Sequence, residues 1–226
     1  MGEIAHDEES PVTATPGQLK ETVAELFRLP TKAVDYPWRA MREAGLVSKG
    51  GRGPSAAKVT ATDAALLLIA VTGPLPAADV VTAVRRYAGL PIQTWPGEAV
   101  ESPVAPPAIA DAQTFVDGLA GLIASAADGS LAIYRDHISR KPDQDPRVPG
   151  YFELEVTLYG AFPQAGFRAY GGNGELKRHF TDMPTDIDEL RVWKTTQPGD
   201  DSDLSTLNRF GGRTIWRLGE LIGEAK

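Results

Sequence analysis

Residues 31–60 constrain the fold of this chain most, because they join two helical patterns through a short cationic loop. The first pattern ends at Gly45, since glycine readily adopts the left-handed conformation that terminates helices. The basic, glycine-rich loop 49–54 follows, and Thr60 is then placed to cap a helix over residues 61–72. This order predicts a compact helical unit from which a basic loop projects.

Shorter elements are expected on both sides of the loop. We expect a short helix at residues 31–34 and then a second helix that Asp35 caps, with Pro37 in its first turn, where proline is tolerated. Residues 46–48 and 57–59 are expected to be the two strands of a wing. Upstream, an N-cap, an N1 proline and a capping-box glutamine predict a helix that ends near Pro30; these are Thr15, Pro16 and Gln18.

Cationic and hydrogen-bonding side chains in this region are candidates for contact with nucleic acid. Tyr36, Arg39 and Arg42 lie on nearly the same helix face, and arginine can bind guanine or phosphate while a tyrosine hydroxyl can reach the backbone. In the loop, glycines permit close approach to DNA. Its candidates are Lys49, Arg52, Ser55 and Lys58. The alternatives are a solvated helix face, with Arg42 paired to Asp35 or Glu43, and an ordinary surface loop.

The run from Trp38 to Val47, together with the glycine-arginine loop and the helix led by Thr60, resembles the winged helix-turn-helix of bacterial regulators and of phage and mobile-element proteins. The resemblance covers about a quarter of the chain. It implies DNA contact through five cations, which are Arg39, Arg42, Lys49, Arg52 and Lys58. Pro37 departs from the usual recognition helix. A further helix is expected from Ala77 to Ala88, which completes a DNA-binding domain over residues 16–90.

The charge distribution agrees with this assignment although the net charge of the chain is -7. Residues 1–16 carry four acids and no Lys or Arg, and we expect residues 1–15 to be a disordered acidic tail. Residues 17–90 carry ten Lys and Arg against six acids, whereas residues 91–226 carry thirteen against twenty. The only net-basic segment is therefore the one with the helix-turn-helix pattern.

The remainder of the chain predicts a second, mixed domain, so the expected class is α+β. Five prolines mark residues 91–107 as a linker, which is followed by a domain over residues 108–226 that serves dimerisation or partner binding. A helix is expected over 108–127, and residues 152–159 alternate strictly as a strand with one buried face. Further strands are expected at 167–170 and 176–180, in a meander. Residues 131–134 and 191–195 are additional strand candidates, and 204–222 is expected to be a helix interrupted at Gly211-Gly212.

Several function classes are disfavoured by the sequence. The chain has no cysteine, which excludes disulfides, thiol catalysis and thiolate-bound zinc. Its three histidines have no metal-ligand spacing, no nucleophile motif is present, and the glycine loop lacks the GxxxxGK[ST] phosphate-binding pattern. The longest apolar run, residues 64–71, is too short to cross a bilayer. We therefore expect a cytoplasmic protein that is not an enzyme, has no cofactor or metal and does not bind membranes.

Two hypotheses from different classes follow. In the first, the protein is a sequence-specific double-stranded DNA-binding regulator of phage or mobile-element type, and it forms a homo-oligomer, in the simplest case a dimer. A small-terminase-like DNA-packaging protein is a variant of this hypothesis. In the second, the helix-turn-helix does not function and the acidic C-terminal half acts as a protein-interaction adaptor. Duplex affinity that falls steeply with salt is expected only of the first.

Overall fold

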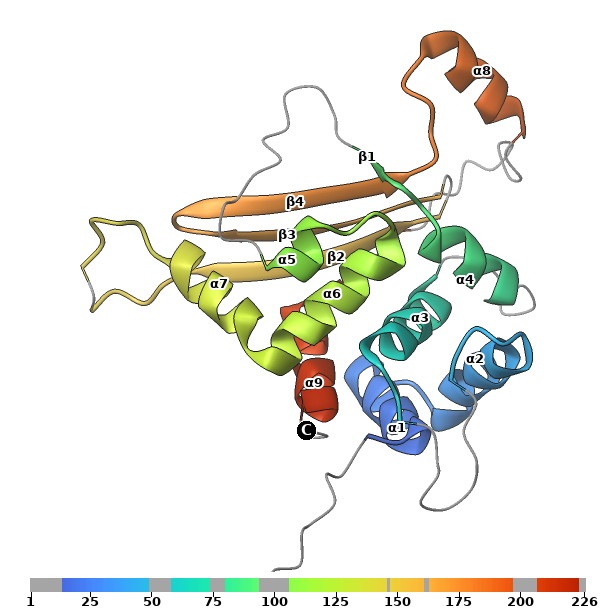
Figure 1. Ribbon diagram of the computed structural model, residues 1–226, viewed down its shortest axis with the longest axis horizontal. Coiled ribbons are helices and arrows are strands. Elements are labelled where there is room, and N and C mark those ends of the chain that lie inside the picture. The colour runs from blue at the N-terminus through green and yellow to red at the C-terminus, as the bar shows by residue number, and fades with distance from the viewer. Residues whose placement is uncertain are drawn as a thin grey trace, which may run out of the picture.

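The computed structural model describes residues 14–48, 58–73, 80–93, 106–145, 147–160, 163–196 and 207–223. These residues form helices and one antiparallel sheet (Figure 1), which confirms the α+β class. The helices are α1 (Pro16–Phe27), α2 (Thr31–Glu43), α3 (Ala61–Thr72), α4 (Val80–Ala88), α5 (Pro107–Ala110), α6 (Phe115–Asp128), α7 (Ser130–Ser139), α8 (Ile187–Thr196) and α9 (Gly212–Gly223). The strands are β1 (Ile92–Gln93), β2 (Phe152–Tyr159), β3 (Gln164–Gly171), β4 (Gly174–Thr181) and β5 (Leu207–Gly211).

The sheet has the strand order β1-β4-β3-β2-β5, and all neighbouring strands are antiparallel. The meander expected from the alternating pattern is confirmed as β2, β3 and β4. Val156 lies opposite Phe167, and Phe167 lies opposite Arg178. Because directly opposed residues share a face of the sheet, these three side chains point to the same side. That side carries most of the buried residues of all three strands.

Helices cover this apolar face of the sheet, and the opposite face is polar and partly exposed (Figure 1). Gly118 of α6 lies directly against two aromatic rings of the sheet. A Cβ atom at this position would be 2.7 Å from a ring carbon of Phe167 and 3.1 Å from one of Phe180. The missing side chain therefore allows α6 to pack closely onto β3 and β4.

Both additional strand candidates are helical, so those two predictions are wrong. Residues 131–134 belong to α7, where Leu131, Tyr134 and Ile138 are buried at helical rather than alternating spacing. Residues 191–195 belong to α8, and the Asp186 side chain accepts hydrogen bonds from the backbone N–H groups of its first turn.

Two predicted helices do not form as single helices over their whole predicted lengths. The helix expected over 108–127 is two helices, α5 and α6, because Thr114 starts α6 afresh with a capping box that includes Asp117. The final helix expected from residue 204 begins only at Gly212. The residues just before it form β5, in which Phe210 lies opposite Val156 of β2, so pairing with β2 replaces the expected helical turns.

The first helix is confirmed, with Thr15 as N-cap, Pro16 at its start and Gln18 completing the capping box. The next prediction is wrong, because α2 is one continuous helix and Asp35 does not cap a separate one. The Asp35 carboxylate instead accepts a hydrogen bond from the ammonium group of Lys20 on α1, at 2.5 Å. Pro37 is buried inside α2.

The described residues beside the basic loop do not form wing strands. Residues 46–48 and 58–59 have no strand pairing, so that part of the wing prediction is wrong, and Ala57 lies outside the described residues. Val47 and Val59 are buried between the helices, and the backbone N–H of Val59 donates to the carbonyl of Ala14 at 3.1 Å. These two valines are therefore held by burial and, for Val59, by the backbone hydrogen bond to Ala14.

One cluster of buried side chains extends from α1 through α3 and α6 to the sheet and α9. Leu19, Leu68, Leu122, Val156 and Leu218 belong to it, and α3 packs against α6. The division of the chain at residues 91–107 stays a prediction; within that segment, residues 92–93 form β1 beside β4.

The length and composition of the described helices can be compared with what a membrane-spanning helix requires. None of the helices there is both long and apolar enough on its own to cross a bilayer. The consecutive helices α6 and α7 reach that length and composition only as a pair, and the two are bent by 92° relative to each other.

Candidate nucleic-acid interface

Helices α1 and α2 are joined by a turn of only three residues, Arg28, Leu29 and Pro30. Arg28 takes the left-handed conformation, with φ 54°, and Leu29 donates its N–H to the carbonyl of Ala24 at 2.8 Å. Pro30 then starts α2, and its carbonyl accepts the N–H of Ala33. The turn is therefore closed by backbone hydrogen bonds, which sets the relative orientation of the two helices.

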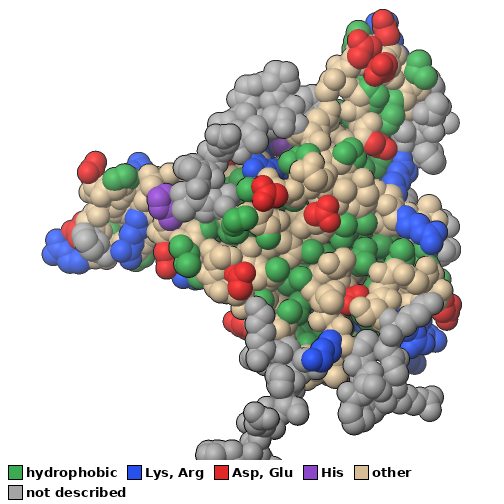
Figure 2. Space-filling view, viewed as in Figure 1, with side chains coloured by type: hydrophobic (Ala, Val, Ile, Leu, Met, Phe, Trp, Pro, Cys, Tyr) green, Lys and Arg blue, Asp and Glu red, His purple; other side chains and the backbone are tan. Residues whose placement is uncertain are grey.

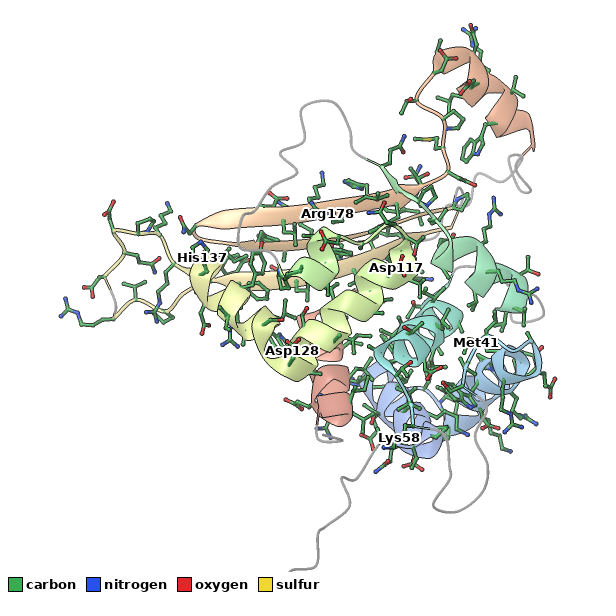
Figure 3. The ribbon with its side chains drawn as sticks, viewed as in Figure 1. Met41, Lys58, Asp117, Asp128, His137 and Arg178 are labelled. Carbon is green, nitrogen blue, oxygen red and sulfur yellow. The ribbon has the colours of Figure 1, made fainter. Side chains whose placement is uncertain are left out.

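The buried side of α2 determines which side faces outward. Val34, Trp38 and Met41 are at most 3 % exposed and belong to the core. Figure 3 shows Met41 on the side of α2 that faces the other helices. Because residues four and three positions apart share a helix face, the opposite side of α2 carries an exposed row. The row consists of Lys32, Tyr36, Arg39 and Glu43, with exposed Arg42 at its flank.

The structure brings three predicted contact residues together on this outward side. Tyr36 is 46 % exposed and the Arg39 side chain 59 % exposed, and Arg42 is exposed on the next turn. Lys32 was missed by the sequence analysis, because it precedes Tyr36 by one turn and the two share a face only when α2 is continuous. A prediction of one helix over residues 31–43 would have placed Lys32 on the same face as Tyr36.

Asp35 neutralises part of the positive charge on this surface. Its carboxylate contacts Lys20 at 2.5 Å and the Arg39 Nε at 3.3 Å. The hydrogen bond from Lys20, followed by the positive charges of Lys20, Arg39 and Arg42, lowers the pKa of Asp35 from its ordinary value. Asp35 therefore pairs with Arg39 rather than with Arg42. Within the described part of the chain, the guanidinium group of Arg42 makes no ion pair or hydrogen bond, so it is available to an incoming anion.

The basic loop can be described only at its two ends. Lys49, Arg52 and Ser55 lie outside the described residues. Lys58 is exposed and lies at the edge of the helices beside α1 (Figure 3). Asp63 of α3 joins the two ends, since its carboxylate accepts hydrogen bonds from the N–H and hydroxyl groups of Ser48 and of Thr60, at 2.9 to 3.0 Å. The loop therefore starts and finishes at one point next to α2.

Two exposed arginines of the sheet are paired with acids. On the open face of the sheet, Arg168 bonds to Glu175 at 2.6 Å and Arg209 bonds to Glu155 at 2.8 Å. These pairs leave no excess positive charge on that face. A polyanion is therefore attracted less strongly there than to α2.

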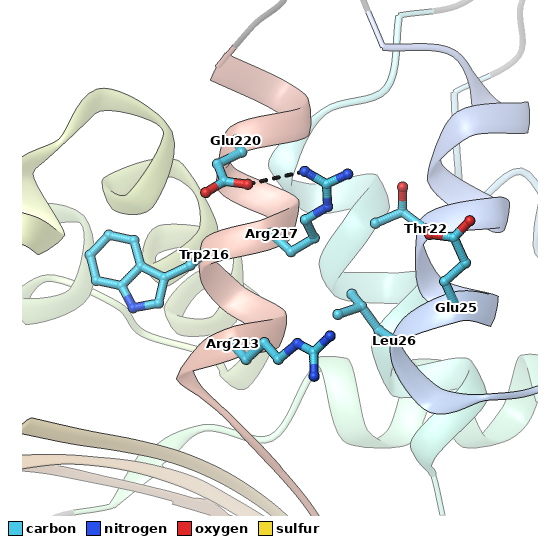
Figure 4. A pocket seen from close by; sticks show the side chains of 7 residues that line it. All are labelled: Thr22, Glu25, Leu26, Arg213, Trp216, Arg217 and Glu220. Carbon is cyan, nitrogen blue, oxygen red and sulfur yellow. Dashed lines mark hydrogen bonds and ion pairs between the residues drawn. The ribbon is translucent and has the colours of Figure 1, made fainter.

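A cavity of about 240 Å³ between α1 and α9 has a similar balance of charge (Figure 4). Arg213 and Arg217 project from α9 towards α1, and Arg217 Nη1 lies 3.2 Å from Glu220 Oε2. The full lining is Thr22, Glu25, Leu26, Arg213, Trp216, Arg217 and Glu220. Two arginines against two glutamates give this cavity no net charge with which to attract phosphate.

No arrangement for metal binding occurs in the described ranges, where no three His, Asp or Glu side chains are placed to share an ion. Comparisons of the chain with protein-family models, with curated proteins and with solved structures gave no match. The function is therefore inferred from the geometry and charge of α2 and its surroundings.

Proposed function

We propose that the protein binds double-stranded DNA through the outward face of α2 and acts as a sequence-specific regulator of phage or mobile-element type. The observation that carries this proposal is the row of Tyr36, Arg39 and Arg42 on a helix that follows α1 after a three-residue turn. An α-helix with its side chains fits the width of the major groove, and helix-turn-helix proteins place their second helix there.

The individual side chains have different roles in this proposal. The guanidinium group of Arg42 is available to bind the O6 and N7 atoms of a guanine or a phosphate oxygen. Arg39 already shares its charge with Asp35 at 3.3 Å, so it binds phosphate while keeping or exchanging that partner. Tyr36 presents a hydroxyl group that can hydrogen-bond a phosphate, and Lys32 adds a cation at the start of the row.

Sequence specificity at useful affinity requires more contact than one module provides, so we propose that the protein binds as a homodimer. Sedimentation equilibrium of the free protein measures this directly. A dimer supports a regulator that reads two half-sites, whereas a larger closed ring favours the small-terminase-like packaging variant.

Fluorescence anisotropy with a pool of labelled duplexes tests the DNA-binding proposal. The informative variant carries Arg39→Ala with Arg42→Ala, and the matched control carries Arg213→Ala with Arg217→Ala on α9. Both variants lose two exposed arginines, but only the first changes the outward side of α2. If a folded wild-type protein does not bind duplex at low salt, the proposal is wrong, and the adaptor hypothesis becomes the one to test with protein partners.

A further inference from the structure

The cavity between α1 and α9 is lined by two charged side chains of opposite sign that do not pair with each other. Arg213 projects from α9 towards α1, the helix that carries Glu25, and both line the same space of about 240 Å³ (Figure 4). Within the described part of the chain, neither side chain makes an ion pair or a hydrogen bond, whereas the neighbouring Arg217 pairs with Glu220. The cavity therefore offers one cation and one anion to a ligand.

Each of these two charges lies at the helix end whose partial charge has the same sign. Arg213 is in the first turn of α9, which contains no acid, and the first turn of a helix carries a partial positive charge. Glu25 is in the last turn of α1, which contains no base, and the last turn carries a partial negative charge. The helix dipoles therefore strengthen the positive potential beside Arg213 and the negative potential beside Glu25.

The rest of the lining limits the size and chemistry of a ligand. Leu26 and Trp216 supply apolar surface, and both are packed against the hydrophobic core, which fixes their positions. Thr22 supplies a hydroxyl group. Pockets for drug-sized ligands have volumes of about 300–1,000 Å³, so this smaller cavity suits a molecule of a few heavy atoms with one apolar group.

We propose that this cavity binds a small zwitterion of the α-amino-acid class with an apolar side chain. The ligand carboxylate accepts charge-assisted hydrogen bonds from Arg213, its ammonium group donates to Glu25, and its side chain contacts Leu26. A zwitterion is favoured over a simple anion, because an anion would pair with Arg213 while being repelled by Glu25. A simple cation meets the reverse difficulty.

The simpler reading is that Arg213 and Glu25 are ordinary solvated charges. Figure 2 shows acidic and basic side chains interspersed over the face of the molecule that it draws, so isolated surface charges are common on this protein. These two differ because they share one cavity and because each is opposed by its own helix dipole. Solvated charges predict no ligand binding, so a binding measurement separates the two readings.

Isothermal titration calorimetry of the full chain with L-leucine is the first test. Two analogues of the same size each lack one of the charges: 4-methylpentanoate has no ammonium group, and 3-methylbutylamine has no carboxylate. A charge-assisted hydrogen bond contributes enough that each analogue should bind at least about tenfold more weakly than leucine. No binding of leucine at millimolar concentration by a folded protein overturns the proposal, and so does equal binding of leucine and either analogue.

Variants then assign each ligand group to its side chain. Arg213→Ala should weaken leucine binding at least about tenfold and should abolish the preference for leucine over 3-methylbutylamine. Glu25→Gln should abolish instead the preference for leucine over 4-methylpentanoate. The matched controls are Arg140→Ala on the C-cap of α7 and Glu21→Gln on α1, since both residues are exposed and neither lines the cavity.

The controls should keep the affinity and the preferences of wild type. Leucine binding that both Arg213→Ala and Glu25→Gln leave unchanged would place the amino acid elsewhere and overturn the proposal. If Arg213→Ala does not fold by circular dichroism, Arg213→Gln replaces it with the same expectation. The cavity is lined by no residue from the outward side of α2, so failure of amino-acid binding and failure of DNA binding are independent results.

Discussion

The Asp63 carboxylate accepts a hydrogen bond from the backbone N–H of Ser48 at 3.0 Å, across the whole basic loop. Its other oxygen accepts from the Ser48 hydroxyl and from the N–H and hydroxyl of Thr60. Asp63 is 3 % exposed, so its buried carboxylate has its hydrogen bonds satisfied by these donors. The carboxylate that completes the cap of α3 therefore also holds Ser48, before the basic loop, close to Thr60, after it.

Asp63→Ala should destabilise the protein by about 2–4 kcal/mol, because it removes a cap and leaves four partly buried hydrogen bonds without their acceptor. Urea unfolding monitored by circular dichroism measures this loss. Asp117→Ala is the matched control, since Asp117 completes the same kind of capping box with Thr114 but is exposed. The control should lose only about 0.5–2 kcal/mol. Equal losses for the two variants would show that Ser48 adds nothing to the role of Asp63.

Asp35→Asn should have little effect on stability and should strengthen DNA binding. The ion pairs with Lys20 and Arg39 are partly exposed, so their loss is expected to lower the free energy of unfolding by no more than about 1 kcal/mol at neutral pH. The substitution also removes a negative charge from the surface of α2, which favours phosphate. Anisotropy should show tighter duplex binding than wild type; weaker binding would show that Asp35 orients Arg39 for contact.

The same pair predicts the pH dependence of that stability difference. The pKa of Asp35 in the folded protein is lowered, so its contribution is present above the ordinary aspartate value of 3.8 and is lost as the pH falls through the folded-state pKa. Unfolding of wild type and Asp35→Asn should therefore differ at pH 7 and converge below pH 3.8. A difference that persists at low pH would mean that another interaction of Asp35 is responsible.

Tyr87→Phe removes only the hydroxyl group that bonds to the Tyr159 carbonyl. We expect a loss of about 0.5–1.5 kcal/mol in the free energy of unfolding, because this partly buried hydrogen bond is lost. Tyr36→Phe serves as the control, since Tyr36 is 46 % exposed and its hydroxyl can bond to water. Both variants are compared in urea, and a loss as large for the control would refute the anchoring role of Tyr87.

Gly118→Ala should disturb the contact between α6 and the sheet. The added methyl would lie 2.7 Å from the Phe167 ring, which packs against Phe180 with ring centroids 5.7 Å apart and so has little room to move. Overpacking of this kind costs about 1–3 kcal/mol, partly offset by the better helix propensity of alanine. Gly17→Ala, where the nearest atom is 3.7 Å away, should be neutral or slightly stabilising. Differential scanning calorimetry measures both changes.

Local patterns in the sequence account for the elements that form through local interactions. Thr15, Pro16 and Gln18 predict the start of α1, and the strict alternation from Phe152 predicts β2 within its observed bounds. Asp35 shows the limit of this reasoning. The same aspartate is compatible with an N-cap or with a tertiary ion pair, and its partner Lys20 is fifteen residues away in the chain.

The other missed elements also depend on distant residues. Residues 207–211 form a strand because they pair with β2, and the sequence near them contains no signal of that partner. For the candidate interface, the outward placement of Tyr36, Arg39 and Arg42 follows from the spacing of their buried neighbours.

The most direct test of the central claim is the duplex affinity of the Arg39→Ala, Arg42→Ala variant across salt concentrations, beside wild type and the Arg213→Ala, Arg217→Ala control. DNA binding through α2 predicts salt-sensitive binding by wild type and control, and its loss in the α2 variant with folding retained by circular dichroism. Equal binding by all three proteins, or none by a folded wild type at low salt, would contradict it.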